Sequence, residues 1–390
     1  FANREQVASI GYETSQKAHN ALRWLLARQG KYIDGEMTVV WKLPQNLKEK
    51  DSNLALDVVD LFGDTQETFL ADFDWAAECR DEDDIELDRK FAEKLNQAMA
   101  GYRAKLQPDD EVIILSVDAA TTGRLAVTYY QEVPGNEFID RVLHWHQNCT
   151  WPRWIKLHET KKWVFINNTA PSPNEIALAA YGTEQEKGYL ACSDKLKKTT
   201  IRRILPCIIG LSPKIPADIV KAAVNRASNP QAYSSFVWQN CVAPVACAMI
   251  KYNEFDGKVN SMELEKDRSY LFGQLLAILE KVEERALYLQ ESKTDDRLTN
   301  AKKMWNVYTR RPAITYERLY SHIVRAYLKR LNPGARAKIE NEIMQIINVL
   351  RETDGFNNNP LNERYLLGYY EEREKLMKSK GEKSNEGGEE

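Results

Sequence analysis

The sequence lacks the short motifs that identify several large classes of protein. It has no GxxxxGK[ST] loop, which disfavours a P-loop nucleotide engine, and it has neither GxGxxG nor GxSxG. Its six cysteines form no CxxC pair and no regular framework, so we expect reduced thiols in a cytoplasm. No run of about 18 apolar residues occurs, which disfavours a membrane-spanning helix.

The composition is that of a soluble, globular chain with more than one domain. It has 390 residues, of which 43% are hydrophobic and 28% charged. A chain of this length predicts two or three domains, because a single core stops growing at roughly 250–300 residues. There is no signal peptide and the chain begins with Phe1, so we expect its natural N-terminus to be missing.

The charges are unevenly distributed, although the net charge is only −3. Residues 78–88 contain seven acidic side chains and one arginine. Residues 302–338 contain ten Lys or Arg and a single acid, Glu317, which is a net charge of +9 over 37 residues. Basic residues are also clustered at 195–203. Such clusters are either solvated faces or surfaces for a polyanion.

The first two thirds of the chain have the alternating character of a mixed α/β protein. Helical spacing of apolar residues predicts helices at 9–30, 86–106 and 136–147, and Pro216 is expected to start another that runs to about 225. Thr14 or Ser15 is expected to cap the first helix and Gly30 to end it. Strands are predicted at 37–43, 111–117 and 123–133, the last with an alternation of two.

From Met262 the pattern changes to an all-α bundle with short loops. Helices are predicted at 262–290, 298–310, 313–331, 335–352 and 361–379, separated by Pro312 and by Pro333–Gly334. We therefore predict an α+β fold with four regions: a helix-rich mixed region at 1–110, a strand-containing α/β region at 111–260, the bundle at 262–380, and a disordered polar tail at 381–390.

The helix predicted at 313–331 separates cations from aromatic side chains. At 100° per residue, Arg318, Arg325 and Lys329 share one stripe. The opposite side is apolar and aromatic and consists of Tyr316, Tyr320, Ile323, Tyr327 and Leu331. No acid follows Glu317 in this helix, which favours a surface for a polyanion.

The stretch from Asp118 to Arg124 admits three interpretations: a catalytic loop, a nucleic-acid contact, or a turn between two strands. An aspartate that a strand delivers into a loop of small residues resembles the first strand pair of RuvC-like nucleases, where it binds a metal. Glu132, Asp140 and Glu159 are the available further carboxylates, but none lies in a recognisable second motif. The turn interpretation makes Asp118 a capping or turn residue.

Two other groups of side chains suggest a metal site only weakly. His144, His146, Cys149 and His158 match no standard zinc spacing, so packing or surface roles are favoured. The acidic run at 81–88 contains adjacent carboxylates without a fixed scaffold, which is typical of a solvated loop. We predict no metal and no cofactor.

Four blocks distributed over the chain resemble one family, the large subunit of the type I-C CRISPR Cascade. They are "SIGYETSQKAHNALRWLLARQG", "VDAATTGRLAVTYYQEV", "LEKDRSYLFGQLLAILEKVEERA" and "LLGYYEEREKL". The resemblance implies a non-catalytic DNA-binding subunit that supports target recognition, stabilises the R-loop and recruits the helicase–nuclease in antiviral defence. The implied partners are the backbone and small subunits, the guide RNA, the target and non-target DNA strands, and the helicase–nuclease. Family members carry a further N-terminal region in which motif reading is expected.

The resemblance also suggests roles for particular residues. The bundle resembles the small subunit, which in this family arises by internal translation, so Met262 is the expected start of a free copy of 262–390. Two alternative functions stay open beside the resemblance: a RuvC-like metal-dependent nuclease that uses Asp118, and a structural adaptor whose basic stripe binds an acidic protein. The expected nucleic-acid contacts are Arg124, Lys197, Lys198, Arg202, Arg203, Lys302, Lys303, Arg310, Arg311, Arg318, Arg325, Lys329 and Arg330.

Overall fold

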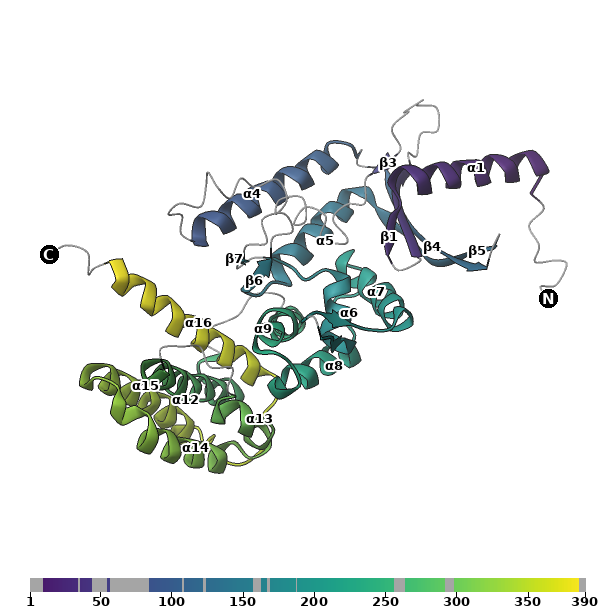
Figure 1. Ribbon diagram of the computed structural model, residues 1–390. Helices are drawn as coiled ribbons and strands as arrows, with labels where there is room; N and C mark the ends of the chain where they lie inside the picture. Colours follow the sequence, from purple (N-terminus) through teal and green to yellow (C-terminus); the bar gives the residue numbers. More distant parts are fainter. Residues whose placement is uncertain are drawn as a thin grey trace. The chain divides into compact units, whose positions relative to one another are not determined.

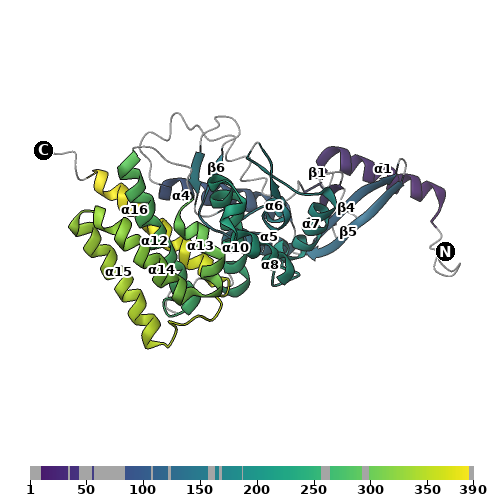
Figure 2. The ribbon, with the colours of Figure 1, turned by 60° about the horizontal axis from the view of Figure 1, so that its bottom comes forward.

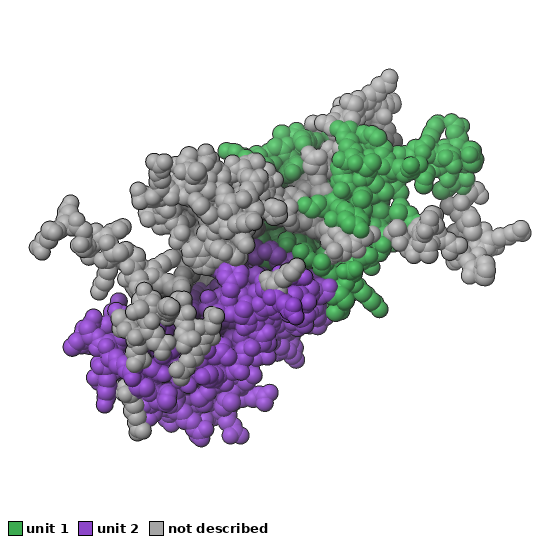
Figure 3. All heavy atoms as spheres, viewed as in Figure 1, with its two compact units in different colours: residues 1–147, 156–174, 193–213 green, residues 148–155, 175–192, 214–390 purple. Residues whose placement is uncertain are grey.

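A computed structural model describes most of the chain. The described residues are 10–33, 36–43, 55–56, 84–106, 109–121, 124–156, 163–166, 169–186, 188–255, 264–291 and 298–385. They divide into two compact units (Figure 3): unit 1 comprises 1–147, 156–174 and 193–213, and unit 2 comprises 148–155, 175–192 and 214–390. Each unit is built from three separate segments, so the units do not correspond to the four contiguous regions predicted from the sequence, and that division stays a prediction. Met262 lies outside the described residues.

Unit 1 contains an antiparallel sheet with the strand order β1-β2-β4-β5, and β3 pairs with β2. The three predicted strands are confirmed within it. The strands are β1 (Lys31–Ile33), β2 (Glu36–Leu43), β3 (Ala55–Leu56), β4 (Glu111–Thr121) and β5 (Arg124–Pro134). Val39 lies opposite Leu115, and Asp118 lies between Glu36 on one side and Ala126 on the other.

The two faces of this sheet are covered by different helices, because successive side chains of a strand point to opposite faces. Helix α1 (Tyr12–Gln29) covers one face (Figure 1), where Leu22 and Leu26 pack on Val39, Leu115 and Val117. The polar positions of β2 and β4 face α7 (Asp194–Ile208) on the other side. The predicted caps of α1 are wrong, since Gly11 precedes the helix and provides no side chain, whereas Gly30 ends it as expected.

The remaining elements before the bundle are mostly helical. Pro216 is the residue before α8 and not its first helical residue. The elements are α4 (Asp84–Arg103), α5 (Gly135–Asn148), β6 (Arg153–Lys156), β7 (Trp163–Ile166), α6 (Pro173–Tyr181), β8 (Thr183–Glu184), β9 (Leu190–Ala191), α8 (Ala217–Ala227), η2 (Pro230–Ala232), α9 (Ser235–Val237), the π-helical turn η3 (Trp238–Val242) and α10 (Ala243–Phe255).

The C-terminal part of unit 2 is a helical bundle (Figure 2). Its elements are α12 (Arg268–Glu291), α13 (Asn300–Arg310), α14 (Pro312–Ala326), η4 (Leu328–Arg330), α15 (Pro333–Glu352) and α16 (Arg364–Asn385). The five predicted helices are all present. The third ends at Ala326 and not at 331, because Tyr327 leaves the helical conformation and a 3-10 turn follows.

Two glycines bring α12 and α16 into backbone contact. A Cβ atom at Gly273 of α12 would overlap the carbonyl oxygen of Tyr365 in α16. A Cβ atom at Gly368 of α16 would likewise overlap the carbonyl oxygen of Tyr270 in α12. Only glycine permits this approach, so the closest helix pair of the bundle depends on both positions.

Aromatic side chains fill the space beside this helix pair. The indole ring of Trp305 lies 5.2 Å from that of Trp238 and 4.8 Å from the ring of Tyr369, in edge-to-face arrangements. The Trp305 Nε1 donates a hydrogen bond to the Tyr365 hydroxyl, 3.0 Å away, and Trp305 is 1% exposed. Trp305 is therefore a core anchor of the bundle.

These elements confirm the predicted α+β class, with an antiparallel sheet in the N-terminal half and helices in the C-terminal part. Among the helices in the described ranges, none combines the length and the apolar character needed to cross a membrane.

Candidate nucleic-acid interface

Helices α13 and α14 bury their apolar residues and leave cations in solvent. Ala301, Trp305 and Tyr308 of α13 are buried, as are Tyr316 and Ile323 of α14, which follows the spacing of three and four residues. Six exposed cations lie on α13, α14 and η4 and on the residue that joins the two helices. We call them the basic surface: Lys303, Arg310, Arg311, Arg318, Lys329 and Arg330.

The charges of the basic surface lack ion-pair partners, although Lys303 lies within electrostatic range of Glu283. Within the described part of the chain, none of the six forms an ion pair with an acidic side chain. The Arg330 guanidinium lies over the Tyr327 ring, 5.7 Å from its centre. Lys329 belongs to the 3-10 turn and not to the predicted helical stripe, and the side chain of Arg325 lies outside the described residues.

Lys302, the immediate neighbour of Lys303, has a different environment. Its ammonium is buried 3.4 Å from the carboxylate of Glu280 and 3.2 Å from the Ser235 hydroxyl. Glu280 is fully buried and also accepts hydrogen bonds from Arg373, at 3.2 Å, and from Tyr369. Lys302 thus compensates a buried carboxylate, and we leave it out of the proposed nucleic-acid surface.

The buried ion cluster around Glu280 shifts the pKa of Arg373. Burial by itself lowers this pKa, but Tyr369, Glu280 and Glu284 together hold it well above its usual value. A second carboxylate, Glu284, accepts a hydrogen bond of 2.9 Å from Arg373. Arg373 therefore stays charged, and the cluster ties α12 to α13 and α16.

The basic residues of α7 are largely occupied within unit 1. Lys198 donates to Asp118 at 3.0 Å, and Arg202 Nε lies 3.1 Å from both carboxylate oxygens of Glu36. Their neighbours Lys197 and Arg203 are half-buried and exposed, respectively. Lys198 and Arg202 therefore hold α7 on the sheet, and we leave them out of the proposed surface as well.

Asp118 is not a turn or capping residue, which corrects the sequence-based interpretation. Strand β4 continues to Thr121, so Asp118 lies inside it and points toward α7, with the Arg202 guanidinium 3.9 Å away in addition to Lys198. Strand β5 begins at Arg124, whose side chain lies outside the described residues. The turn itself falls at 122–123, also outside them.

The structure does not support a metal site at Asp118. Two cations already compensate its charge, and Asp140 is paired with Arg103 while Glu132 accepts from Tyr130. Glu159 and His158 lie outside the described residues. Among the residues that are described, no group of three or more His, Cys, Asp or Glu side chains is positioned to hold a metal ion, which includes His144, His146 and Cys149.

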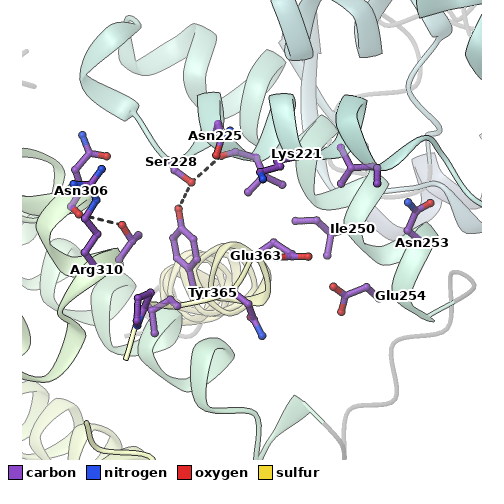
Figure 4. A pocket seen from close by; sticks show the side chains of 17 residues that line it. Lys221, Asn225, Ser228, Ile250, Asn253, Glu254, Asn306, Arg310, Glu363 and Tyr365 are labelled. Atoms are coloured by element: carbon purple, nitrogen blue, oxygen red, sulfur yellow. Dashed lines mark hydrogen bonds between the residues drawn. The ribbon is translucent and has the colours of Figure 1, made fainter. Parts of the chain in front are cut away.

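A pocket of about 740 Å³ lies in unit 2 between α8, α10, α13 and the segment before α16 (Figure 4). Asn306 and Arg310 lie at one side of it, and Asn253 and Glu254 at the opposite side. Buried Ile250 and Tyr365 also line it. The volume lies within the range of about 300–1,000 Å³ that ligand pockets typically have.

Some polar side chains of this pocket are occupied and others are not. The Tyr365 hydroxyl donates to Ser228, and both Asn253 side-chain atoms bond the backbone of Ile215. Among the described residues we find no hydrogen-bond partner for four exposed side chains of the lining: Lys221, Asn225, Asn306 and Arg310.

Carboxylates dominate the opposite side of the pocket. Burial raises the pKa of Glu254, the hydrogen bond from Arg364 lowers it, and neighbouring Glu363 raises it again, so that the net shift is upward. Arg364 bridges Glu254 and Asp267, the latter at 3.0 Å. The pocket is thus cationic at the Arg310 side and acidic at the Glu254 side.

Sequence reasoning did not find this pocket. Lys221 and Asn225 are four residues apart on α8, as are Asn306 and Arg310 on α13, and this spacing predicts a shared helix face. Nothing in the sequence shows that these two faces meet. Arg310 is the one pocket residue that the sequence analysis selected.

Comparison with known proteins adds one finding. A family model described as CRISPR-associated protein (Cas_Csd1) matches residues 2–377, which is nearly the whole chain. No individual curated protein matches it.

Proposed function

The chain belongs to the CRISPR-associated Csd1 family, the large subunits of type I-C Cascade, and from this premise we propose that it is a non-catalytic subunit whose basic surface holds DNA. The observation that carries the proposal is the set of six exposed cations on α13, α14 and η4 that have no acidic partner in the described part of the chain. The only acid on the exposed face of α14 is Glu317.

Phosphate contacts explain why such a surface suits this family. In an RNA-guided complex the guide reads the sequence by base pairing, and protein contributes contacts to the nucleic-acid backbone. Lysine and arginine side chains that meet phosphates release bound counterions, which gives affinity without sequence preference. The proposed role is therefore to support target recognition and to stabilise the R-loop on the target or the non-target strand.

The proposed partners follow from the same premise. They are the backbone and small subunits of the complex, the guide RNA, both DNA strands, and the helicase–nuclease that the complex recruits. Family membership supports an association with other Cascade subunits.

The test is the salt dependence of DNA binding by the full chain. We expect the triple substitution Arg311→Ala, Arg318→Ala and Arg330→Ala to weaken binding to unrelated sequences alike. Each lost phosphate contact should flatten the slope of log K against log salt by about 0.9 for duplex or about 0.7 for single strands. Arg310 is left intact because it also lines the pocket.

A matched control distinguishes this surface from the general charge of the protein. Lys266 and Lys338 are also exposed in unit 2, and both lie outside the basic surface. The substitutions Lys266→Ala and Lys338→Ala should change the slope much less than Arg318→Ala and Arg330→Ala. An unchanged slope in the triple variant refutes the proposal and favours the adaptor that binds an acidic protein. We also expect no cleavage of DNA by the purified chain with magnesium or manganese.

A further inference from the structure

The pocket of unit 2 adjoins the basic surface. Arg310 belongs to both, and the segment that closes the pocket is fastened to the same two helices. The backbone N–H of Leu361 donates to the Thr309 carbonyl of α13 at 2.8 Å, and the Asn358 side chain accepts from Ile314 of α14 at 3.0 Å. A strand that follows the basic surface therefore passes the pocket at Arg310.

The lining of the pocket suits a ligand with polar edges and a small apolar face. Ile250 is 1% exposed and Tyr365 is 2% exposed, so the apolar surface that a ligand can reach includes mainly half-buried side chains such as Val224 and Leu361. Among the described residues the amide groups of Asn225 and Asn306 have no hydrogen-bond partner and can donate and accept at the rim. The Tyr365 hydroxyl is already engaged by Ser228 and Trp305, so its ring is fixed in the wall.

The charged side chains of the pocket restrict the ligand further. Among the described residues, Lys221 and Arg310 have no protein partner and are available to a phosphodiester. Glu254 already accepts a hydrogen bond of 2.5 Å from Arg364, whereas the exposed carboxylate of Glu363 beside it is available as an acceptor and would repel a free inorganic anion. A ligand with a phosphate at one end and an amino group at the other satisfies both sides.

We propose that this pocket takes a single unpaired nucleotide from the DNA held by the basic surface, with its phosphate at Lys221 and Arg310 and an exocyclic amino group at Glu363. Cytosine, adenine and guanine carry such an amino group, whereas thymine does not. The pocket therefore favours those three bases over thymine. This inference rests on the proposed function, because the basic surface is what presents the strand.

Recognition of this kind differs from the usual stacking of single strands on exposed aromatic rings. Among the described lining residues the only aromatic side chain is Tyr365, which is buried. Discrimination between bases must therefore come from hydrogen bonds to the base edge. One good pair of such hydrogen bonds changes the affinity roughly tenfold.

The experiment compares fluorescence anisotropy titrations of the full chain with oligodeoxycytidine and oligothymidine, each of about 16 nucleotides. These two pyrimidine strands carry equal numbers of phosphates. Cytosine has an amino group at the position where thymine has a carbonyl oxygen, and thymine also carries a methyl group. We expect the wild type to bind oligodeoxycytidine about tenfold more tightly at the same salt concentration. The ratio of the two affinities is the readout, because a change of overall charge alters both affinities together.

Two substitutions of exposed rim residues locate the preference. Glu363→Ala removes the acceptor and Asn225→Trp fills the pocket, so each should bring the ratio close to one while binding of oligothymidine and its salt dependence persist. Glu352→Ala removes the same charge outside the pocket and should leave the ratio unchanged. Circular dichroism and the thermal midpoint verify that each variant is folded.

The possible outcomes separate the two proposals. Binding of both strands with a wild-type ratio near one overturns the pocket assignment and leaves the basic surface intact. A ratio that persists in both Glu363→Ala and Asn225→Trp overturns it too. If the wild type binds neither strand, the proposed function fails and this inference fails with it.

Discussion

Replacing Gly273 by alanine places a methyl group where α16 passes α12. The new Cβ would overlap the Tyr365 carbonyl oxygen and would lie only 2.8 Å from the Tyr369 backbone nitrogen. Both obstacles are backbone atoms of a helix, so no side-chain rotation relieves the overlap and the helices must separate. Overpacking of this kind costs roughly 1–3 kcal/mol, whereas the better helix propensity of alanine returns at most about 1 kcal/mol.

The separation also loosens the aromatic cluster and the ion cluster that α12 and α16 share, which places the net loss near 2 kcal/mol. For a unit of this size we expect the thermal midpoint to fall by about 4–8 °C. The measurement is thermal unfolding followed by circular dichroism at 222 nm, with reversibility verified by rescanning.

Gly334→Ala is the matched control, since the nearest atom to its Cβ would be the Asn332 Oδ1, 3.9 Å away at the start of α15. This substitution should leave the midpoint unchanged or raise it slightly. If Gly273→Ala is as stable as the wild type, the backbone contact between α12 and α16 is wrong, and with it the packing that positions Arg373 and Tyr365.

Two further predictions concern buried polar groups. Glu280→Gln leaves Lys302 without its buried counter-charge and Arg373 with Glu284 alone, and should lower the free energy of unfolding by roughly 3–5 kcal/mol. Glu352→Gln on the surface should not, and urea unfolding that shows equal stability for both variants would contradict the ion cluster. Burial raises the pKa of the Cys207 and Cys241 thiols to about 11 and that of Cys247 well above its usual value. The thiolate is the reactive form, and it becomes populated only as the pH approaches the raised pKa. These three cysteines should therefore resist iodoacetamide at pH 8 and react after unfolding. The measurement is mass spectrometry of labelled peptides, and prompt labelling of the native chain would refute the raised pKa values.

The sequence alone determined which segments are helices and strands. The spacing of apolar residues at three and four positions identifies the five helices of the bundle, and the alternation of two identifies β5, because these patterns reflect local geometry. The same spacing correctly assigned Tyr316 and Ile323 to the core. The four family blocks, which the family match supports, are likewise visible without a structure.

The end of one helix and the caps of another depend on more than spacing. The apolar pattern continues through Leu328 and Leu331, both of which are buried, yet the backbone leaves the α-helix after Ala326. Burial of an apolar side chain is compatible with a 3-10 turn as well as with an α-helix, so the pattern could not distinguish the two.

Tertiary structure decided which charged residues remain available for a ligand. Lys302 and Lys303 are adjacent in the sequence, but Lys302 meets Glu280 in the core while Lys303 stays in solvent. Asp118 meets Lys198, which lies 80 residues further along the chain. The pocket joins residues of α8, α10 and α13, which are separate segments of the sequence. A charge shows in the sequence, but its compensation depends on distances in space that only the packed fold sets.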